Sequence, residues 1–181
     1  MTRGRAGLVV ALLLGTAPVA SAQLVIRQDN PVRVANHWVG QIMLDTLAIW
    51  ENVPASRART FAAALAVLDS LEMPFERADS TRSVVYHSRI VARRRFANRA
   101  LSQMMRCGGG LTGDNADVWR VTLSFAVYVD SIAAEKSRLG VAIFASAMDV
   151  QGASKPTIIC ATRGALEHEI TRLVLAAVEP R

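Results

Sequence analysis

Several features that mark other protein classes are scarce in this sequence of 181 residues. It has 11 glycines and 6 prolines, too few for a collagen-like or linker-like chain. Only one apolar run approaches the length of a membrane span, and it lies at the N-terminus, which excludes a polytopic membrane protein. Hydrophobic residues nevertheless make up 51% of the chain, which excludes a disordered protein. The length suits one domain, since domains most often have about 100–150 residues.

The motifs of common catalytic classes are also missing. The sequence contains no G-x-S-x-G, S-x-x-K or H-E-x-x-H pattern. Gly108-Gly109-Gly110 with Gly113 comes nearest to a phosphate-binding loop, but Asp114 follows where a P-loop has lysine and then serine or threonine. We therefore interpret the glycine segment as a flexible turn between two elements.

Residues that bind metals are few and scattered. The histidines at 37, 87 and 168 and the two cysteines lack the close spacing of zinc ligands. Glu167, His168 and Glu169 are consecutive, and neighbouring positions on a helix diverge by about 100°, so the three side chains cannot converge on one ion. We interpret them as surface charges, and we expect neither a metal site nor a cofactor.

The first 22 residues have the features of a signal peptide. Arg3 and Arg5 precede a short apolar stretch, and Ala20-Ser21-Ala22 matches the small-x-small pattern of a cleavage site. The apolar stretch is about half of the ~20 residues that a membrane span needs. We predict that 1–22 is removed and that 23–181 forms a single exported domain, periplasmic or extracellular, without a transmembrane span.

Cys107 and Cys160 are the only cysteines. In the oxidising environment expected after export, one pair allows one intramolecular bond. A redox-active pair would usually be C-x-x-C, which is absent. We predict a structural disulfide, which would stabilise the fold by about 4 kcal/mol in the chain-entropy model because the loop that it closes is long.

Alternation of apolar and polar residues predicts antiparallel strands in the C-terminal half. In Val118–Asp130, every second residue from Trp119 to Val129 is apolar, as in a half-buried strand. A mostly apolar second strand is predicted at Leu139–Val150, and Thr157–Ala161 is a short third strand. The intervening segments, 131–138 and 151–156, are predicted turns.

Helical periodicity accounts for three other segments. We predict a helix at Pro54–Glu72, a shorter one at Asn98–Arg106, and a closing helix at Arg163–Val178 that Thr162 caps. The predicted buried stripes are Phe61, Leu65, Leu68 and Leu71 in the first helix and Leu166, Ile170, Leu173 and Ala177 in the last. Short strands are predicted at Phe75–Asp79 and Ser83–His87, and extended chain is predicted at Leu24–Trp50. The order is roughly β-α-β-β-α-β-β-β-α, an α+β fold with an antiparallel sheet and its helices on one face.

The segments around the two cysteines carry a family resemblance. They read C-G-x-G-x-T-G-x-x-A-D from Cys107 and C-x-x-x-G-x-L-E from Cys160. Both resemble segments of uncharacterised secreted bacterial α+β proteins, and this resemblance implies no particular activity. By architecture alone, the order of elements is similar to the helix-grip domains of envelope assembly lipoproteins.

The charge distribution is uneven. Between residues 82 and 106 there are seven arginines and no acidic residue: Arg82, Arg89, Arg93, Arg94, Arg95, Arg99 and Arg106. Such a segment could bind an anionic envelope component or an acidic protein, with Arg89, Arg93, Arg94, Arg95 and Arg99 as the candidate patch. Nucleic acid is not an expected partner, because the protein is expected to be exported and aromatic residues do not interleave with the arginines. The alternative is a solvated segment that acidic residues elsewhere in the fold neutralise.

Two classes of function therefore stay open. One is a non-catalytic binding domain, secreted or periplasmic and associated with the envelope. The other is a small secreted enzyme, hydrolase-like, whose site is assembled from dispersed residues. A deep pocket with converging titratable side chains would favour the enzyme, and an exposed face or shallow groove would favour binding.

Overall fold

The computed structural model describes residues 32–36, 40–111, 113–150 and 157–179. The predicted signal peptide and the predicted turn at 151–156 lie outside these ranges. Within the described part of the chain, no helix is long and apolar enough to cross a membrane.

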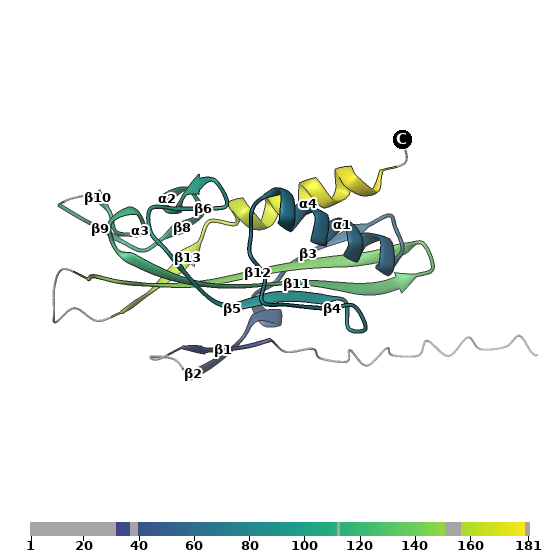
Figure 1. Ribbon diagram of the computed structural model, residues 1–181, viewed down its shortest axis with the longest axis horizontal. Coiled ribbons are helices and arrows are strands. Elements are labelled where there is room, and N and C mark those ends of the chain that lie inside the picture. The colour runs from purple at the N-terminus through teal and green to yellow at the C-terminus, as the bar shows by residue number, and fades with distance from the viewer. Residues whose placement is uncertain (1–31, 37–39, 112, 151–156, 180–181) are drawn as a thin grey trace, which may run out of the picture.

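An antiparallel sheet of seven strands forms the centre of the protein (Figure 1). The strands are β3 (Ile49–Val53), β4 (Arg77–Asp79), β5 (Val84–Ala92), β8 (Met105–Arg106), β11 (Arg120–Ala133), β12 (Lys136–Met148) and β13 (Ile158–Thr162). The long strands β11 and β12 form the middle, and β5 and then β4 continue the sheet on the β11 side. On the other side of β12, β3 pairs with its first half, β13 pairs with its second half, and β8 follows β13.

The last three long strands confirm the predicted meander. β11, β12 and β13 match the predicted strands within a few residues at each end. The connection predicted at Ser131–Arg138 is shorter, because β11 continues to Ala133 and β12 begins at Lys136. Strand pairing thus extends almost to the turn, which leaves a tight hairpin.

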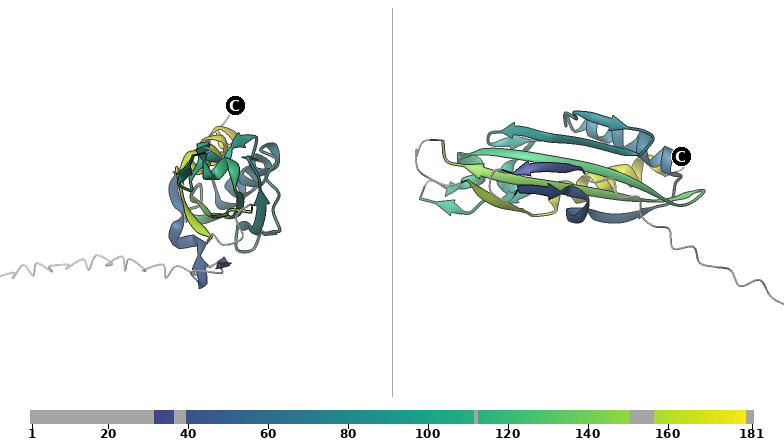
Figure 2. Two further views of the ribbon diagram at one scale, coloured as in Figure 1. Left: turned by 90° about the vertical axis from the view of Figure 1, so that its left-hand side faces the viewer. Right: turned by 90° about the horizontal axis from the view of Figure 1, so that it is seen from below.

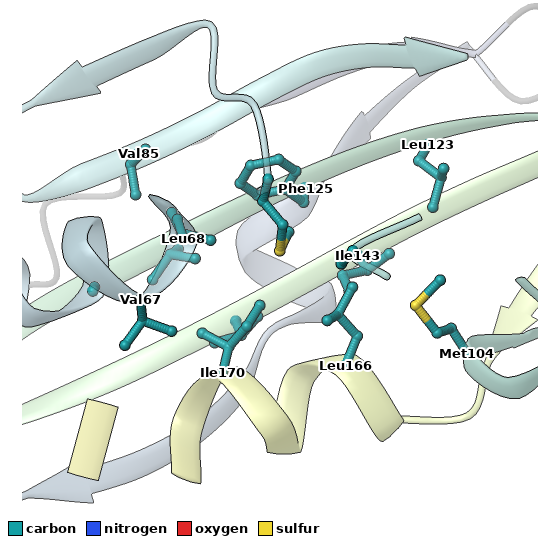
Figure 3. Close-up of a cluster of buried hydrophobic side chains, with 14 of the residues drawn as sticks. Val67, Leu68, Val85, Met104, Leu123, Phe125, Ile143, Leu166 and Ile170 are labelled. Carbon is teal, nitrogen blue, oxygen red and sulfur yellow. The ribbon is translucent and has the colours of Figure 1, made fainter. Parts of the chain in front are cut away.

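Two long helices cover one face of the sheet. α1 (Arg57–Ser70) and α4 (Ala165–Val178) pack against each other and against β11 and β12 (Figures 1 and 2). Between helices and sheet, Val67 and Leu68 of α1 lie near Leu166 and Ile170 of α4, and Phe125 of β11 points into the same layer (Figure 3). This arrangement confirms the predicted α+β fold with helices on one face.

The other face of the sheet has a thinner cover. It is formed by β1 (Arg33–Asn36), β2 (Gly40–Met43) and the 3₁₀ helix η1 (Leu44–Leu47), which belong to the segment predicted as extended. Val32, Val34 and Leu44 pack there on Val84, Ala126, Tyr128 and Ala142. Trp50 lies so close over Gly140 that a Cβ there would stand 2.6 Å from the Trp50 ring. A glycine is therefore needed where the indole crosses β12.

The predicted helix at Asn98–Arg106 is present only in part. Only α2 (Leu101–Met104) is helical, after a small hairpin of β6 (Arg95–Phe96) and β7 (Arg99–Ala100), and β8 follows at once. Both turn residues of the hairpin, Ala97 and Asn98, have positive φ, as a two-residue type I′ turn requires. Pairing of β8 with β13 then holds the chain extended beyond Met104.

The ends and buried faces of the long helices also differ from the prediction. α4 begins at Ala165, and its N-cap is Gly164 with φ 73° rather than Thr162. Ala177 is exposed, and Val174 and Val178 are buried instead. The buried residues follow every fourth position from Leu166 to Val178, with Glu167 and Thr171 beside them, so the buried face differs from the predicted one toward the end of the helix. In α1, Phe61 and Leu68 are buried as predicted, whereas Leu65 and Leu71 are only partly buried; Thr60, Ala64 and Val67 complete the buried face.

Candidate functional site

A disulfide joins Cys107 and Cys160, as predicted. Their Cα atoms are 4.3 Å apart, and both residues are buried at the end of the helix-covered core. The bond ties the chain after β8 to β13, whose backbones are already paired. Because both cysteines of the chain are in this bond, neither is a nucleophile.

The glycine segment after Cys107 forms a small hairpin next to the disulfide. β9 (Gly109–Gly110) pairs with β10 (Gly113–Asp114), and the four-residue helix α3 (Asn115–Val118) follows. The Asn115 side chain donates to the Cys107 carbonyl oxygen, and the Asp114 carboxylate accepts the Ala116 N–H. The side chains of Asn115 and Asp114 therefore bond to the backbone of this segment and stabilise its turn.

The interpretation of Glu167 as a surface charge is wrong, because this residue is 1% exposed. It lies in the first turn of α4, where the positive end of the helix dipole favours a carboxylate. The Thr162 hydroxyl donates to Glu167 Oε1 and accepts the Gly164 N–H. Glu167 Oε2 is buried without a hydrogen-bond partner among the described residues. The carboxylate therefore supports the turn that enters α4.

The two neighbours of Glu167 point elsewhere. His168 is exposed, and Glu169 is held by two hydrogen bonds from Arg172 and an ion pair of 3.4 Å with Arg99. The Arg172 hydrogen bonds, and to a smaller extent the two arginine charges, lower the pKa of Glu169. Within the described ranges, no three His, Cys, Asp or Glu side chains gather as a metal ion would require.

The structure separates the arginines of residues 82–106. β5 lies between Arg82 and Arg93, and this strand alone spans about 26 Å at about 3.3 Å per residue. Arg82 precedes β5 and lies 4.0 Å from the Asp79 carboxylate. Arg99 lies in β7 on the helix side, where it pairs with Glu169. Acidic residues elsewhere in the fold thus neutralise two of the seven, as the alternative interpretation expects.

The remaining candidates cluster where β5 ends. We call Arg89, Arg93, Arg94 and Arg95 the β5-end arginines, and all four are exposed. Ile90 and Ala92 pack into the helix-side core, so alternation places Arg89 and Val91 on the opposite face. Arg95 donates to the Asn98 carbonyl oxygen, and none of the four has an acidic partner among the residues that the structure describes.

One group of titratable side chains lies along the outer edge of β5. Glu76 accepts hydrogen bonds from the hydroxyl and the N–H of Ser88, and it lies 3.9 Å from His87 Nδ1. These hydrogen bonds lower the pKa of Glu76. A catalytic serine would bond to the histidine, but here His87 Nδ1 accepts the Arg89 N–H and Ser88 bonds to the carboxylate. The arrangement holds the edge of the sheet rather than activating a nucleophile.

Sequence reasoning missed a buried polar group on the thinly covered face. Tyr128 is 4% exposed, and its hydroxyl lies near the Val32 backbone without an ordinary hydrogen bond to any described residue. Burial, and secondarily the Asp45 carboxylate, raises the pKa of Tyr128 above its usual range. The alternation in β11 indicated that Tyr128 faces away from the helices, but nothing in the sequence indicated what would cover it.

No protein-family model matches this sequence, and no curated protein is significantly similar to it.

Proposed function

We propose that this protein is a non-catalytic, exported binding domain that attaches to an anionic envelope surface through the β5-end arginines. The observation that carries the proposal is the exposure of four guanidinium groups within seven residues, at one end of the sheet. None of the four has an acidic partner in the described part of the chain. Like charges held close together repel, and the described residues do not offset this repulsion. An anionic partner would therefore lower the electrostatic free energy of the cluster.

The chemistry of the cluster favours phosphate-bearing surfaces. A guanidinium group is planar and donates two parallel hydrogen bonds to a phosphate oxygen pair. Arg93 and Arg94 lie where the chain leaves β5, and both are exposed. Val91, which is 54% exposed beside them, adds apolar area next to the charges. An acidic protein is the competing partner class.

The alternative of a secreted hydrolase receives less support from the same region. The serine, histidine and glutamate nearest to the arginines hold the sheet edge and lack a bond between nucleophile and base. A hydrolase would need its acid, base and nucleophile to be within hydrogen-bond reach of one another.

Charge reversal tests the proposal. The exported form of the protein would be sedimented with vesicles of phosphatidylglycerol and phosphatidylcholine, and with phosphatidylcholine alone, at about 0.01 M and 0.5 M salt. We expect binding only to the anionic vesicles and only at low salt. Arg93→Glu with Arg94→Glu should weaken it at least about tenfold, because each arginine near an anionic surface contributes about 1 kcal/mol.

A matched control separates the effect of these arginines from the effect of net charge. Arg57→Glu with Lys136→Glu changes the charge by the same amount at exposed positions near the other end of the sheet, where β11 turns into β12. This control should bind nearly as the parent protein does. Equal losses in both variants, or no binding by the parent at low salt, would contradict the proposal. Binding to an acidic polypeptide but not to vesicles would assign the cluster to an acidic protein.

A further inference from the structure

A second group of arginines surrounds a recess at the start of β5. The recess has a volume of about 170 Å³ and lies between β1, β4 and β5. The register of β4 and β5 explains which residues line the recess. Arg77 pairs with Tyr86 and Asp79 pairs with Val84, and paired residues share a face of the sheet. Val84 and Tyr86 pack with the cluster opposite the helices, so the recess opens on the thinly covered face.

The charges around the recess are unbalanced. Arg33, Arg77 and Arg82 line it together with a single acidic residue, Asp79. Asp79 is already engaged, because its Oδ1 accepts the Arg82 N–H at 3.1 Å and its Oδ2 lies 4.0 Å from Arg82 Nε. These contacts hold the turn between β4 and β5, and they neutralise at most one of the three guanidinium groups.

The other two arginines remain available. Arg33 makes one long hydrogen bond of 3.4 Å, to Gln41 Oε1, and is exposed. Arg77 is exposed and has no ion pair or side-chain hydrogen bond with the residues that the structure describes. The pairs of β4 with β5, and of β1 with β2, hold the two backbones in place. The recess therefore combines cationic donors, carried on paired backbones, with the apolar side chains of Val32 and Val84.

We infer that this recess binds a small oxyanion, a phosphate or carboxylate group, between Arg33 and Arg77 with Arg82 at its rim. Guanidinium groups recognise both kinds of group through paired hydrogen bonds. The volume is below the about 300 Å³ at which pockets for drug-sized ligands begin, so it suits a single anionic group rather than a large cofactor. The length of β5 separates this recess from the β5-end arginines, so the inference is independent of the proposed function.

Titration with inorganic phosphate and with succinate tests the inference and distinguishes the two chemistries. We expect saturable binding of at least one of them by the parent protein, measured by calorimetry or by amide shifts of residues 77–86. Arg33→Gln with Arg77→Gln should weaken that binding at least about tenfold. Arg57→Gln with Lys136→Gln removes the same charge far from the recess and should leave the affinity unchanged.

Asp79→Asn gives a prediction of opposite sign. An asparagine side chain still accepts the Arg82 backbone N–H, so the turn is kept while one negative charge that lines the recess is removed. At the dielectric constant of water and a charge separation of about 5 Å, this change should tighten binding about fourfold. Thermal unfolding of each variant confirms that the fold is intact.

Three results would overturn the inference. The first is that neither anion binds to the parent protein in a saturable way. The second is that the control weakens binding as much as the arginine variant does. The third is that Asp79→Asn leaves binding unchanged or weaker. Arg93→Glu with Arg94→Glu should leave anion binding at the recess nearly unaffected, so loss of binding in that variant would assign the anion to the β5 end.

Discussion

The two faces of the central sheet bury different chemistry. On the helix side, β11 and β12 contribute mostly apolar side chains, with Ser137, which bonds to Thr60 of α1, as an exception. The helices α1 and α4 cover this face together with Leu101 and Met104 of α2. On the other side, a short hairpin and one 3₁₀ helix cover a small cluster that includes Tyr128 and the half-buried Trp50, Tyr86 and Phe144. The recess with its arginines opens on that second face. The comparison indicates that one face supplies most of the stability and leaves the other free to carry polar and charged groups.

Two phenylalanines on neighbouring strands provide the most sensitive test of this difference. Phe125 is 1% exposed on the helix side, and Phe144 is only partly buried on the other side. We expect Phe125→Ala to lower the free energy of unfolding by about 3–5 kcal/mol, and Phe144→Ala to lower it by less than half as much. Urea unfolding measures both. Equal losses would mean that the two faces contribute equally.

Removing the disulfide should have the next largest effect. Cys107→Ser with Cys160→Ser should lower the free energy of unfolding by about 2–4 kcal/mol, because the unfolded chain regains the freedom of a long closed loop. Replacing both cysteines avoids a free thiol, and the parent protein under reducing conditions is the matched control. An unchanged urea midpoint would mean that β8 and β13 hold this end of the core without the bond.

Among the described residues, Glu167 is the one acidic or basic side chain that is fully buried on the helix side. A substitution of Thr162, its hydrogen-bond partner, tests its role. Thr162→Val removes the hydroxyl that donates to Glu167 and accepts the Gly164 N–H. We expect a loss of about 1–3 kcal/mol, since a buried carboxylate oxygen loses its partner. Thr162→Ser keeps the hydroxyl and should cost much less. Similar losses for both substitutions would contradict a role for this hydrogen bond.

Tyr128 on the other face should show the smallest effect at neutral pH. Its hydroxyl makes no ordinary hydrogen bond to the described residues, so Tyr128→Phe should change the free energy of unfolding by less than about 1 kcal/mol. Burial raises the pKa of Tyr128, so the contribution of the neutral form is complete below the unfolded pKa of about 10 and is lost as pH rises above it. The variant should therefore become more stable than the parent protein above about pH 10. A constant difference across that range would contradict the pKa argument.

Long periodic segments, namely the alternating strands and the two long helices, were the parts of the fold that could be predicted from sequence. In β11, every second residue from Val121 to Val129 is apolar, and this series lies in the helix-side core. The prediction that the strand is half-buried is wrong, because Ala126 and Tyr128 on its other face are buried too. Short elements do not carry such a pattern. The β6–β7 hairpin depends on positive φ at Ala97 and Asn98. The dipeptide Ala-Asn is not a strong sequence signal for such a turn, whereas Asn-Gly is.

The candidate sites show the same limit. Glu167 was predicted to be exposed because charged residues usually are. It is buried because of how α4 packs on the sheet, which the sequence does not indicate. The arginines formed one segment in the sequence, but an extended strand separates Arg82 from Arg93 by most of the length of the sheet. Arg33 and Arg77 are more than 40 residues apart, and only the packing of β1 on the central sheet brings them to one recess.

Hydrogen–deuterium exchange with and without phosphatidylglycerol vesicles tests most directly which part of the molecule meets a partner. The proposal predicts slower exchange in peptides that cover residues 89–95 and unchanged exchange in α1 and α4. Protection confined to α1 and α4, or none at 89–95 under conditions where the protein sediments with the vesicles, would contradict it.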